Sequence, residues 1–272
     1  MHAPSLSFMN KNMKKYITPI LLILIGLATL SFTADTGVTL KLKPETGKTY
    51  TITSKSVSTN TVGDPDFSLS SSQIMTVRQS FTAKDVTGNQ VVVSSQIDAI
   101  KLSMSLMGMD IDYDSEHPTE ANPLIEDQIK AYSKSLKKPF SITFDAKGNM
   151  INGKNELSMS QLSGAIVPLP KEELKVGSKW SSQNKQDISG TRLTVKMDYT
   201  VTAISATSVD LSFIGTVKAK DTSGSLSGTA NINPQTGMIT KSTTKANISM
   251  TIREQGWSTP ATIKATTDIE VK

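Results

Sequence analysis

Apolar and polar residues alternate along most of this chain, in runs that are separated by short segments of turn-forming residues. Alternation with a period of two is typical of β-strands that have one buried and one solvated face. The predicted strands are 38–42, 49–59, 70–84, 90–104, 107–113, 140–144, 179–184, 192–204, 208–218, 224–232, 238–252 and 261–271.

Several predicted strands are long, and turn residues lie between them. The turns at 63–66, 85–89 and 233–237 combine Gly with Asp, Asn or Pro, and each predicts a hairpin. Long strands twist and curl, which favours a strongly curved sheet over a flat sandwich. We therefore predict a mainly β fold in which long curved antiparallel strands form a half-barrel or barrel-like sheet.

One stretch follows the helical period instead. Asn122 and Pro123 suit a helix start, and Pro139 follows the last apolar position. Its apolar residues recur three to five positions apart along one stripe: Leu124, Ile125, Ile129, Tyr132 and Leu136. Because the stripe needs an apolar partner, we expect this amphipathic helix to cover the concave face of the sheet.

Segments of the two halves of the chain resemble each other in the same order. Residues 47–51 resemble 177–181, residues 81–94 resemble 201–212, and residues 144–151 resemble 232–239. This order predicts two related β-meanders, at 35–170 and 171–272, the first enlarged by a helix-bearing insertion at 105–138. The alternative is that antiparallel hairpins with Gly and Asn turns simply resemble one another.

The N-terminal region has the pattern of an export signal. Two lysines, Lys14 and Lys15, precede an apolar run at 17–30, which is about 14 residues long and shorter than the roughly 20 that span a bilayer. We assign 1–34 to a signal peptide with an N-terminal extension and 35–272 to a β domain. The expected location is periplasmic or extracellular, and an uncleaved anchor is the alternative. Because the chain has no cysteine, a cysteine-linked lipid anchor is excluded.

The net charge changes when the signal is removed. It contains Lys11, Lys14 and Lys15 and no acidic residue, so 29 basic residues less these three leave 26, against 24 acidic ones. A nearly neutral β domain does not have the concentrated basic face of a nucleic-acid-binding protein. We expect no nucleic-acid partner.

Candidate chemistry is sparse. One acidic cluster could bind a hard cation: Asp110, Asp112, Asp114 and Glu116. It lacks the spacing of a calcium loop, and the alternative is that these residues form the solvent-exposed face of a strand. The neighbouring His117 is the only histidine after the signal, and we expect it in a surface loop. No nucleophile elbow, phosphate-binding loop or dinucleotide fingerprint occurs. We predict neither an enzyme nor a bound metal or cofactor.

Methionines gather where the apolar phase of the strands changes. Leu102, Met104 and Leu106 form one alternating set, and Met107 and Met109 begin the opposite one, which requires a bulge or turn beside the intervening Gly108. Flexible methionines suit either core filling or an adaptable apolar wall. We predict that apolar ligand contacts these residues and the helix stripe: Met104, Met107, Met109, Ile125, Ile129, Tyr132 and Leu136.

Short motifs spread over the chain resemble those of one family. These are 40–50 with Gly47-Lys48-Thr49-Tyr50, 113–115, 144–148, Leu169-Pro170 and 176–180. Together they are similar to an uncharacterised family of exported β proteins from Bacteroidota, a resemblance that implies no activity. At the level of fold, long curved strands with one helix also resemble the half-barrel of periplasmic lipoprotein carriers, which shelter acyl chains.

Two functions fit these observations. The first is a non-catalytic envelope protein that binds or carries an apolar, lipid-like or amphipathic ligand in a groove of the curved sheet, with peripheral association with the envelope. The alternative is a structural or protein-interaction module of the cell envelope with a filled core. An apolar cavity of roughly 300 Å³ or more would favour the first.

The signal assignment predicts the mass of the exported product. We expect the mature chain to begin between Thr29 and Asp35, after the short apolar run. Intact-mass measurement of protein extracted from the cell envelope checks this. A product that keeps residues 17–30 would contradict cleavage.

Overall fold

The structure is a computed structural model that describes residues 37–64, 66–118, 125–153, 166–188, 191–254 and 257–272. These residues belong to one compact unit, Gly37–Lys272. The predicted signal peptide, 1–34, lies outside the described residues. Among the residues described, no helix is long and apolar enough to cross a membrane.

Nearly all regular structure is β. The strands are β1 (Thr49–Asp64), β2 (Phe67–Thr87), β3 (Gln90–Leu106), β4 (Met109–Asp114), β5 (Phe140–Asp145), β6 (Met150–Asn152), β7 (Lys179–Ile188), β8 (Thr191–Ile204), β9 (Val209–Ala219), β10 (Thr222–Ile232), β11 (Ile239–Glu254) and β12 (Trp257–Val271). One helix, α2 (Glu126–Ser135), accompanies them in the described part of the chain.

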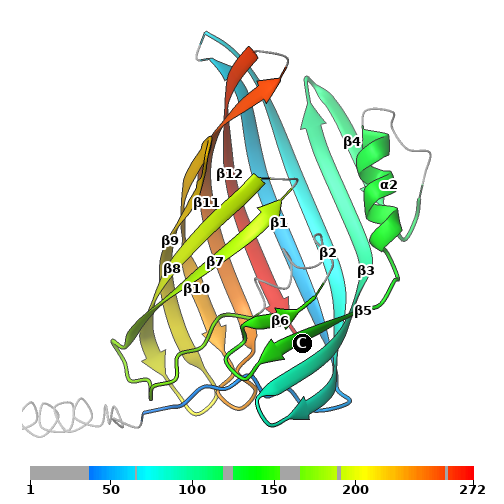
Figure 1. Ribbon diagram of the computed structural model, residues 1–272. Helices are drawn as coiled ribbons and strands as arrows, with labels where there is room; N and C mark the ends of the chain where they lie inside the picture. Colours follow the sequence, from blue (N-terminus) through cyan, green and yellow to red (C-terminus); the bar gives the residue numbers. More distant parts are fainter. Residues whose placement is uncertain (1–36, 65, 119–124, 154–165, 189–190, 255–256) are drawn as a thin grey trace, which may run out of the picture. The chain divides into compact units, whose positions relative to one another are not determined.

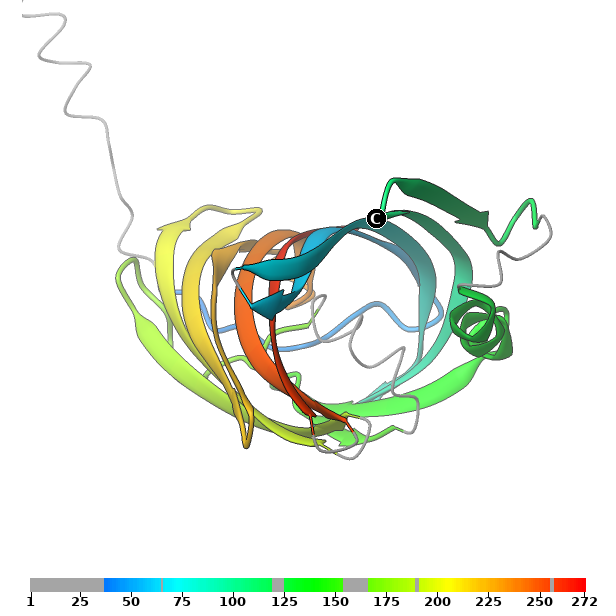
Figure 2. The same cartoon turned by 90° about the horizontal axis from the view of Figure 1, so that it is seen from above.

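All strands join one antiparallel sheet. Its order is β6-β5-β3-β2-β1-β12-β11-β10-β9-β8-β7, and β4 pairs with β3 beside this path. The order runs from β6 to β7 without returning, so the sheet is open. Figures 1 and 2 show it curled into a trough, with β7 to β10 on one side and β2 to β4 on the other. The predicted half-barrel of long curved antiparallel strands is confirmed.

The apolar alternation reverses between Met104 and Met109 because the chain makes a tight turn there. Met107 and Gly108 have φ values of 52° and 78° and connect β3 to β4 as a two-residue hairpin. Positive φ at both central positions matches the twist of the flanking strands. The hairpins predicted at 85–89 and 233–237 also form, between β2 and β3 and between β10 and β11.

Three clusters of buried apolar side chains form the core. The first lies between β1, β2, β3 and β5 and contains Leu42, Tyr50, Ile52, Phe81, Val91, Val93, Ile142, Phe144, Ile166, Met238 and Ile269. The second lies against β8, β9 and β10 and contains Leu40, Val167, Leu169, Leu174, Tyr199, Val201, Val209, Leu211, Phe213, Ala230, Ile232 and Ile239. The third, here called the helix cluster, contains Val77, Ile97, Ile100, Leu102, Ile111, Tyr113, Ile125 and Tyr132, with Met75, Met104, Ile129 and Leu136 packed against it.

The segment at 38–42 is not a strand, although its alternation predicts one. Leu40 and Leu42 are buried in different core clusters, but no strand in the described part of the chain pairs along this segment, and Val38 makes an isolated bridge with Leu174. The backbone N–H of Leu42 donates instead to the carbonyl of Ala146, in a turn. The alternation at 38–42 therefore indicates that one side of the segment is buried. It does not indicate pairing with a neighbouring strand.

The helix is shorter than predicted and lies at one rim of the sheet. It begins at Glu126, whereas the predicted start at Asn122 and Pro123 lies outside the described residues. After the helix, Leu136 bridges to Ile97 of β3, and Lys137 N–H donates to the carbonyl of Ile97. Figures 1 and 2 show α2 beside β3 and β4, away from the middle of the trough.

The two halves have the same strand order. The connected strands β1-β2-β3-β5-β6 match β7-β8-β9-β10-β11, and β4 with α2 is an addition to the first half. The N–H of Gly47 donates to the carbonyl of Ala83, as that of Gly177 does to Val201. A β-bulge also follows Ala83 in β2 and Val201 in β8. The division into two related meanders at 35–170 and 171–272 stays a prediction.

Gly237 provides a test of how the turns dock on the extended N-terminal segment. Its φ is +67°, and a Cβ there would lie 2.6 Å from the carbonyl carbon of Lys41. We expect Gly237→Ala to lower the free energy of unfolding by about 3 kcal/mol, because backbone strain adds to a backbone clash. Urea denaturation measures the loss.

Gly177→Ala is the matched control. Gly177 also has positive φ, +87°, but a Cβ there meets nothing within 4 Å. We expect a loss of about 1 kcal/mol from backbone strain alone. Equal losses for the two variants would contradict the docking contact.

Candidate functional site

The inner face of the sheet can be followed from the strand register, because residues that pair directly across strands lie on the same face. One row of such pairs runs from β2 through β1 and β12 to β7. Its members are Met75, Ser56, Thr267, Thr244, Gly228, Phe213, Tyr199 and Trp180. This row crosses most of the curved sheet and marks the face that is turned inward.

A cavity of about 870 Å³ lies on this inner face. Its apolar lining comprises Met75, Ile142, Phe144, Met150, Ile166, Val167, Leu169, Trp180, Val195, Met197, Tyr199, Phe213, Leu226, Ile239 and Ile269. Pro168 and Pro170 also line it, so the segment after residue 165 forms part of the wall. Glu172 is the one charged residue in this lining, among the residues that the structure describes.

Three rings form an aromatic wall, defined here as Trp180, Tyr199 and Phe213. The rings of Trp180 and Tyr199 are stacked, with centroids 5.0 Å apart and planes 17° apart, and Phe213 is tilted at 6.0 Å from Tyr199. The indole N–H of Trp180 donates to the carbonyl of Pro168 at 2.8 Å. This bond holds the Trp180 ring against the segment that contains Pro168.

Burial also affects the phenol of Tyr199. Removal from water raises its pKa, and a hydrogen bond with the side chain of Ser182 acts in the opposite direction. The phenol therefore stays neutral over the physiological range and contributes an apolar face with one polar tip.

The middle of the inner face carries hydroxyl groups. We define the hydroxyl strip as Ser54, Ser56, Ser242, Thr244 and Thr267, which all line the cavity. They lie on the adjacent strands β1, β12 and β11, and Thr267 Oγ1 donates to Ser56 Oγ at 3.1 Å. The strip separates the aromatic wall from the apolar side chains of Met75, Ile142 and Phe144.

Gly228 leaves space for the Phe213 ring of the aromatic wall. It pairs with both Thr244 and Phe213, between the hydroxyl strip and the wall. A Cβ at this position would clash with the backbone carbonyl of Thr243 and would lie 2.6 Å from Cζ of Phe213, so a larger residue would disturb both β11 and that ring. The glycine lets the ring lie against the backbone of β10.

The seven residues that we predicted to contact ligand lie elsewhere. Met107 and Met109 are exposed at the β3–β4 hairpin, at 69% and 47% of full exposure. The others belong to the helix cluster or pack against it: Met104, Ile125, Ile129, Tyr132 and Leu136. None of these seven side chains lines the 870 Å³ cavity. Their contact with ligand stays a prediction.

Met75 connects the helix cluster to the cavity. It packs against the cluster and also lines the cavity, and the phenol of Tyr132 donates to its sulfur at 3.8 Å. Val77 pairs with Ser54 of β1, and Ile100 of β3 pairs with Val77, so the helix packs on the cavity-bearing face of the sheet, further toward its rim.

The sequence analysis missed the aromatic wall and the hydroxyl strip. Trp180, Tyr199 and Phe213 lie on three successive strands, and only the register of both hairpins brings them side by side. The turn at 204–209 and Gly190 are the sequence signals from which the register of β7, β8 and β9 could have been predicted.

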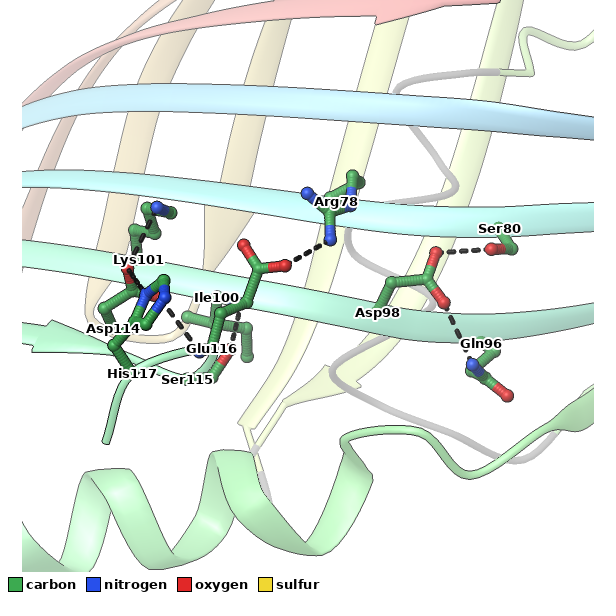
Figure 3. Close-up of polar contacts among 10 residues, drawn as sticks. All are labelled: Arg78, Ser80, Gln96, Asp98, Ile100, Lys101, Asp114, Ser115, Glu116 and His117. Carbon is green, nitrogen blue, oxygen red and sulfur yellow. Dashed lines mark hydrogen bonds and ion pairs between the residues drawn. The ribbon is translucent and has the colours of Figure 1, made fainter.

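The acidic cluster forms ion pairs on the outer face. Lys101 Nζ lies 2.9 Å from Asp114, and Arg78 lies 2.6 Å from Glu116, as Figure 3 shows. The hydrogen bond from Lys101 is the main reason that the pKa of Asp114 is held well below its usual range, and Arg78 likewise lowers the pKa of Glu116. His117 is exposed in the following loop, as predicted.

These contacts pair Asp114 and Glu116 with cationic side chains. Ser115 Oγ accepts from the N–H of Ile100, which fastens the loop after β4 to the sheet (Figure 3). Among the described residues, no group of three or more His, Cys, Asp or Glu side chains is placed to hold a metal.

Part of this chain is similar to a known family. A family described as "Family of unknown function (DUF6263)" matches residues 153–253. No curated protein matches the chain.

Two solved structures are similar to this chain. One, described as "Lipid-protein interactions in lipovitellin", has a TM-score of 0.49 and 12% identity and covers 84% of this chain and 25% of its own. The other, DynF from the dynemicin biosynthesis pathway of Micromonospora chersina, has a TM-score of 0.26 and 8% identity and covers 87% and 86%. This chain spans about a quarter of the lipovitellin chain, and neither likeness carries an argument about function.

Proposed function

We propose that this protein is a non-catalytic binding or carrier protein that holds an apolar or amphipathic ligand in the cavity of its curved sheet. The observation that supports the proposal is the cavity of about 870 Å³ with its predominantly apolar lining. Pockets that bind small organic molecules typically have volumes of roughly 300–1,000 Å³ and apolar walls. An acyl chain or a comparable apolar group would fit this space.

The composition of the lining supports binding without catalysis. Among the described residues of the wall, Glu172 is the one carboxylate, and no histidine, lysine or arginine accompanies it. General acid–base or nucleophilic chemistry needs such groups in mutual contact. The proposal therefore assigns no reaction to the cavity.

The proposed place of action is the cell envelope, outside the cytoplasm. The support is the export pattern at 1–34, with Lys14 and Lys15 before a short apolar run. A carrier of apolar molecules is useful where they must cross water between membranes. The alternative, an interaction module with a filled core, fits less well with a cavity of this volume.

Filling the cavity tests the proposal. Thr244 is half-buried in the cavity floor, so we expect Thr244→Trp to fold and to weaken binding of the neutral fluorescent probe Nile red by at least about tenfold. The indole would occupy the space that the probe needs. Fluorescence titration of the full-length protein measures the affinity.

Lys245→Trp is the matched control, since Lys245 is the next residue of β11 and is exposed on the outer face. It should bind Nile red like the wild type, and circular dichroism should show the same fold for both variants. If Thr244→Trp fails to fold, Ser56→Phe repeats the test from β1. A wild-type protein that binds no probe, or variants that bind equally, would refute the proposal.

A further inference from the structure

We propose that the ligand is an uncharged amphipath whose polar group bears hydroxyls, bound with its chain along the aromatic wall and its hydroxyls on the hydroxyl strip. This inference rests on the proposed function and specifies the class of ligand. A monoacylglycerol is the simplest molecule of this class. Three features of the cavity carry the inference, namely its charge, its hydroxyl groups and their arrangement.

The first feature is the absence of positive charge in the described part of the wall. Glu172 is its one charged side chain, and it is acidic. A carboxylate or phosphate in the cavity would lose hydration without gaining a cationic partner, and it would share the space with a like charge. An anionic head group is therefore disfavoured.

The lysines of the central strands lie on the opposite face. Lys55 directly follows Ser54, Lys245 directly follows Thr244, and both are exposed. Because successive residues of a strand point to opposite faces, these ammonium groups lie on the outside of the trough. Lys264 lies three positions before Thr267, so it is on the outside as well. The chain thus has cations close by in sequence and places none of these three in the cavity.

The second feature is the hydroxyl strip. Each of its Ser and Thr groups can donate one hydrogen bond and accept others, which matches a ligand hydroxyl better than a group that only accepts. Ser54 and Ser242 are buried, and Ser56, Thr244 and Thr267 are half-buried. A polar group of the ligand would meet several partners at once.

The third feature is that the hydroxyl strip and the aromatic wall lie on different strands, although Ser181, Ser182, Gln183 and Asn184 of β7 also line the cavity, as do Ile239 of β11 and Ile269 of β12. The hydroxyl strip lies on β1, β11 and β12, in the middle of the sheet, and the aromatic wall lies on β7, β8 and β9. In Figure 2 these are the central strands of the trough and those of one side. A molecule with one polar and one apolar part fits a cavity that has clustered hydroxyls in its middle and three aromatic rings on one side.

A set of three ligands with the same acyl chain tests the inference. Monopalmitoylglycerol, palmitate and methyl palmitate would each be used to displace Nile red from the full-length protein. We expect monopalmitoylglycerol to bind at least about tenfold tighter than palmitate, and also tighter than methyl palmitate, which lacks hydroxyls. Replacing the cavity's acid by Glu172→Lys should narrow the gap to palmitate.

Paired variants test the hydroxyl strip itself. Thr244→Val with Thr267→Val keeps the shape of the side chains, so it should weaken monopalmitoylglycerol about tenfold and leave methyl palmitate unchanged. Thr262→Val with Thr266→Val, on the outer face of β12, is the control and should change neither.

The outcomes separate this inference from the proposed function. If Nile red binds but the three ligands displace it equally, or palmitate binds tightest, the uncharged amphipath is refuted and the binding protein stands. If the variant with Thr244→Val and Thr267→Val loses affinity for monopalmitoylglycerol and methyl palmitate to the same extent, the hydroxyl strip does not recognise ligand hydroxyls. The inference then fails. A wild-type protein that binds no Nile red overturns both.

Discussion

Packing of two extended segments onto the inner face is the interaction on which the rest of the structure depends. A curved sheet of this length has an inner face that its own strands leave open, and apolar side chains there need a partner. Leu40 and Leu42 come from one segment and Ile166, Val167 and Leu169 from the other, and both segments contribute to the first two core clusters. The bridge between Val38 and Leu174 joins the regions in which these segments lie. Where these segments pack, the inner face is core. Beyond them it is the wall of a cavity.

The shared strand order of the two halves explains why the cavity has two different sides. β7 to β11 follow the same path as β1 to β6, so each half supplies one side of the trough. Among the described residues, β4 and α2 belong to the first half, and Leu136 bridges to Ile97 of β3, which keeps the helix at the rim. An addition to one half therefore adds core beneath Ile129 and Tyr132 without closing the cavity.

Much of the fold could be predicted from the sequence, because long alternating runs and Gly-containing turns are local signals. The helix was predicted too, but its amphipathic stripe shows only that some apolar face covers it and does not show which one. The residues of the cavity were harder to predict. Around Ser54, Lys55 and Ser56 both faces of β1 are polar, so the pattern does not distinguish the cavity from the solvent. The partners of Trp180 depend on the register of β7 to β9, which the alternation within each single strand does not determine.

The polar middle of the inner face bears on what the cavity is for. Threonine and valine have nearly the same shape and both favour strands, so valine at Thr244 and Thr267 would preserve β1, β11 and β12 and would bury more apolar surface. In a filled core, hydroxyls at these positions would be unfavourable, because a polar group that is removed from water without a partner is destabilising. Lysine would solvate the face equally well, and the neighbouring Lys245 shows that the strand accommodates it on the outside. Small uncharged hydroxyls are the choice that keeps the volume open, keeps charge out and still offers hydrogen bonds. This combination suits an occupant that is partly polar and uncharged better than it suits either solvent or a packed interior.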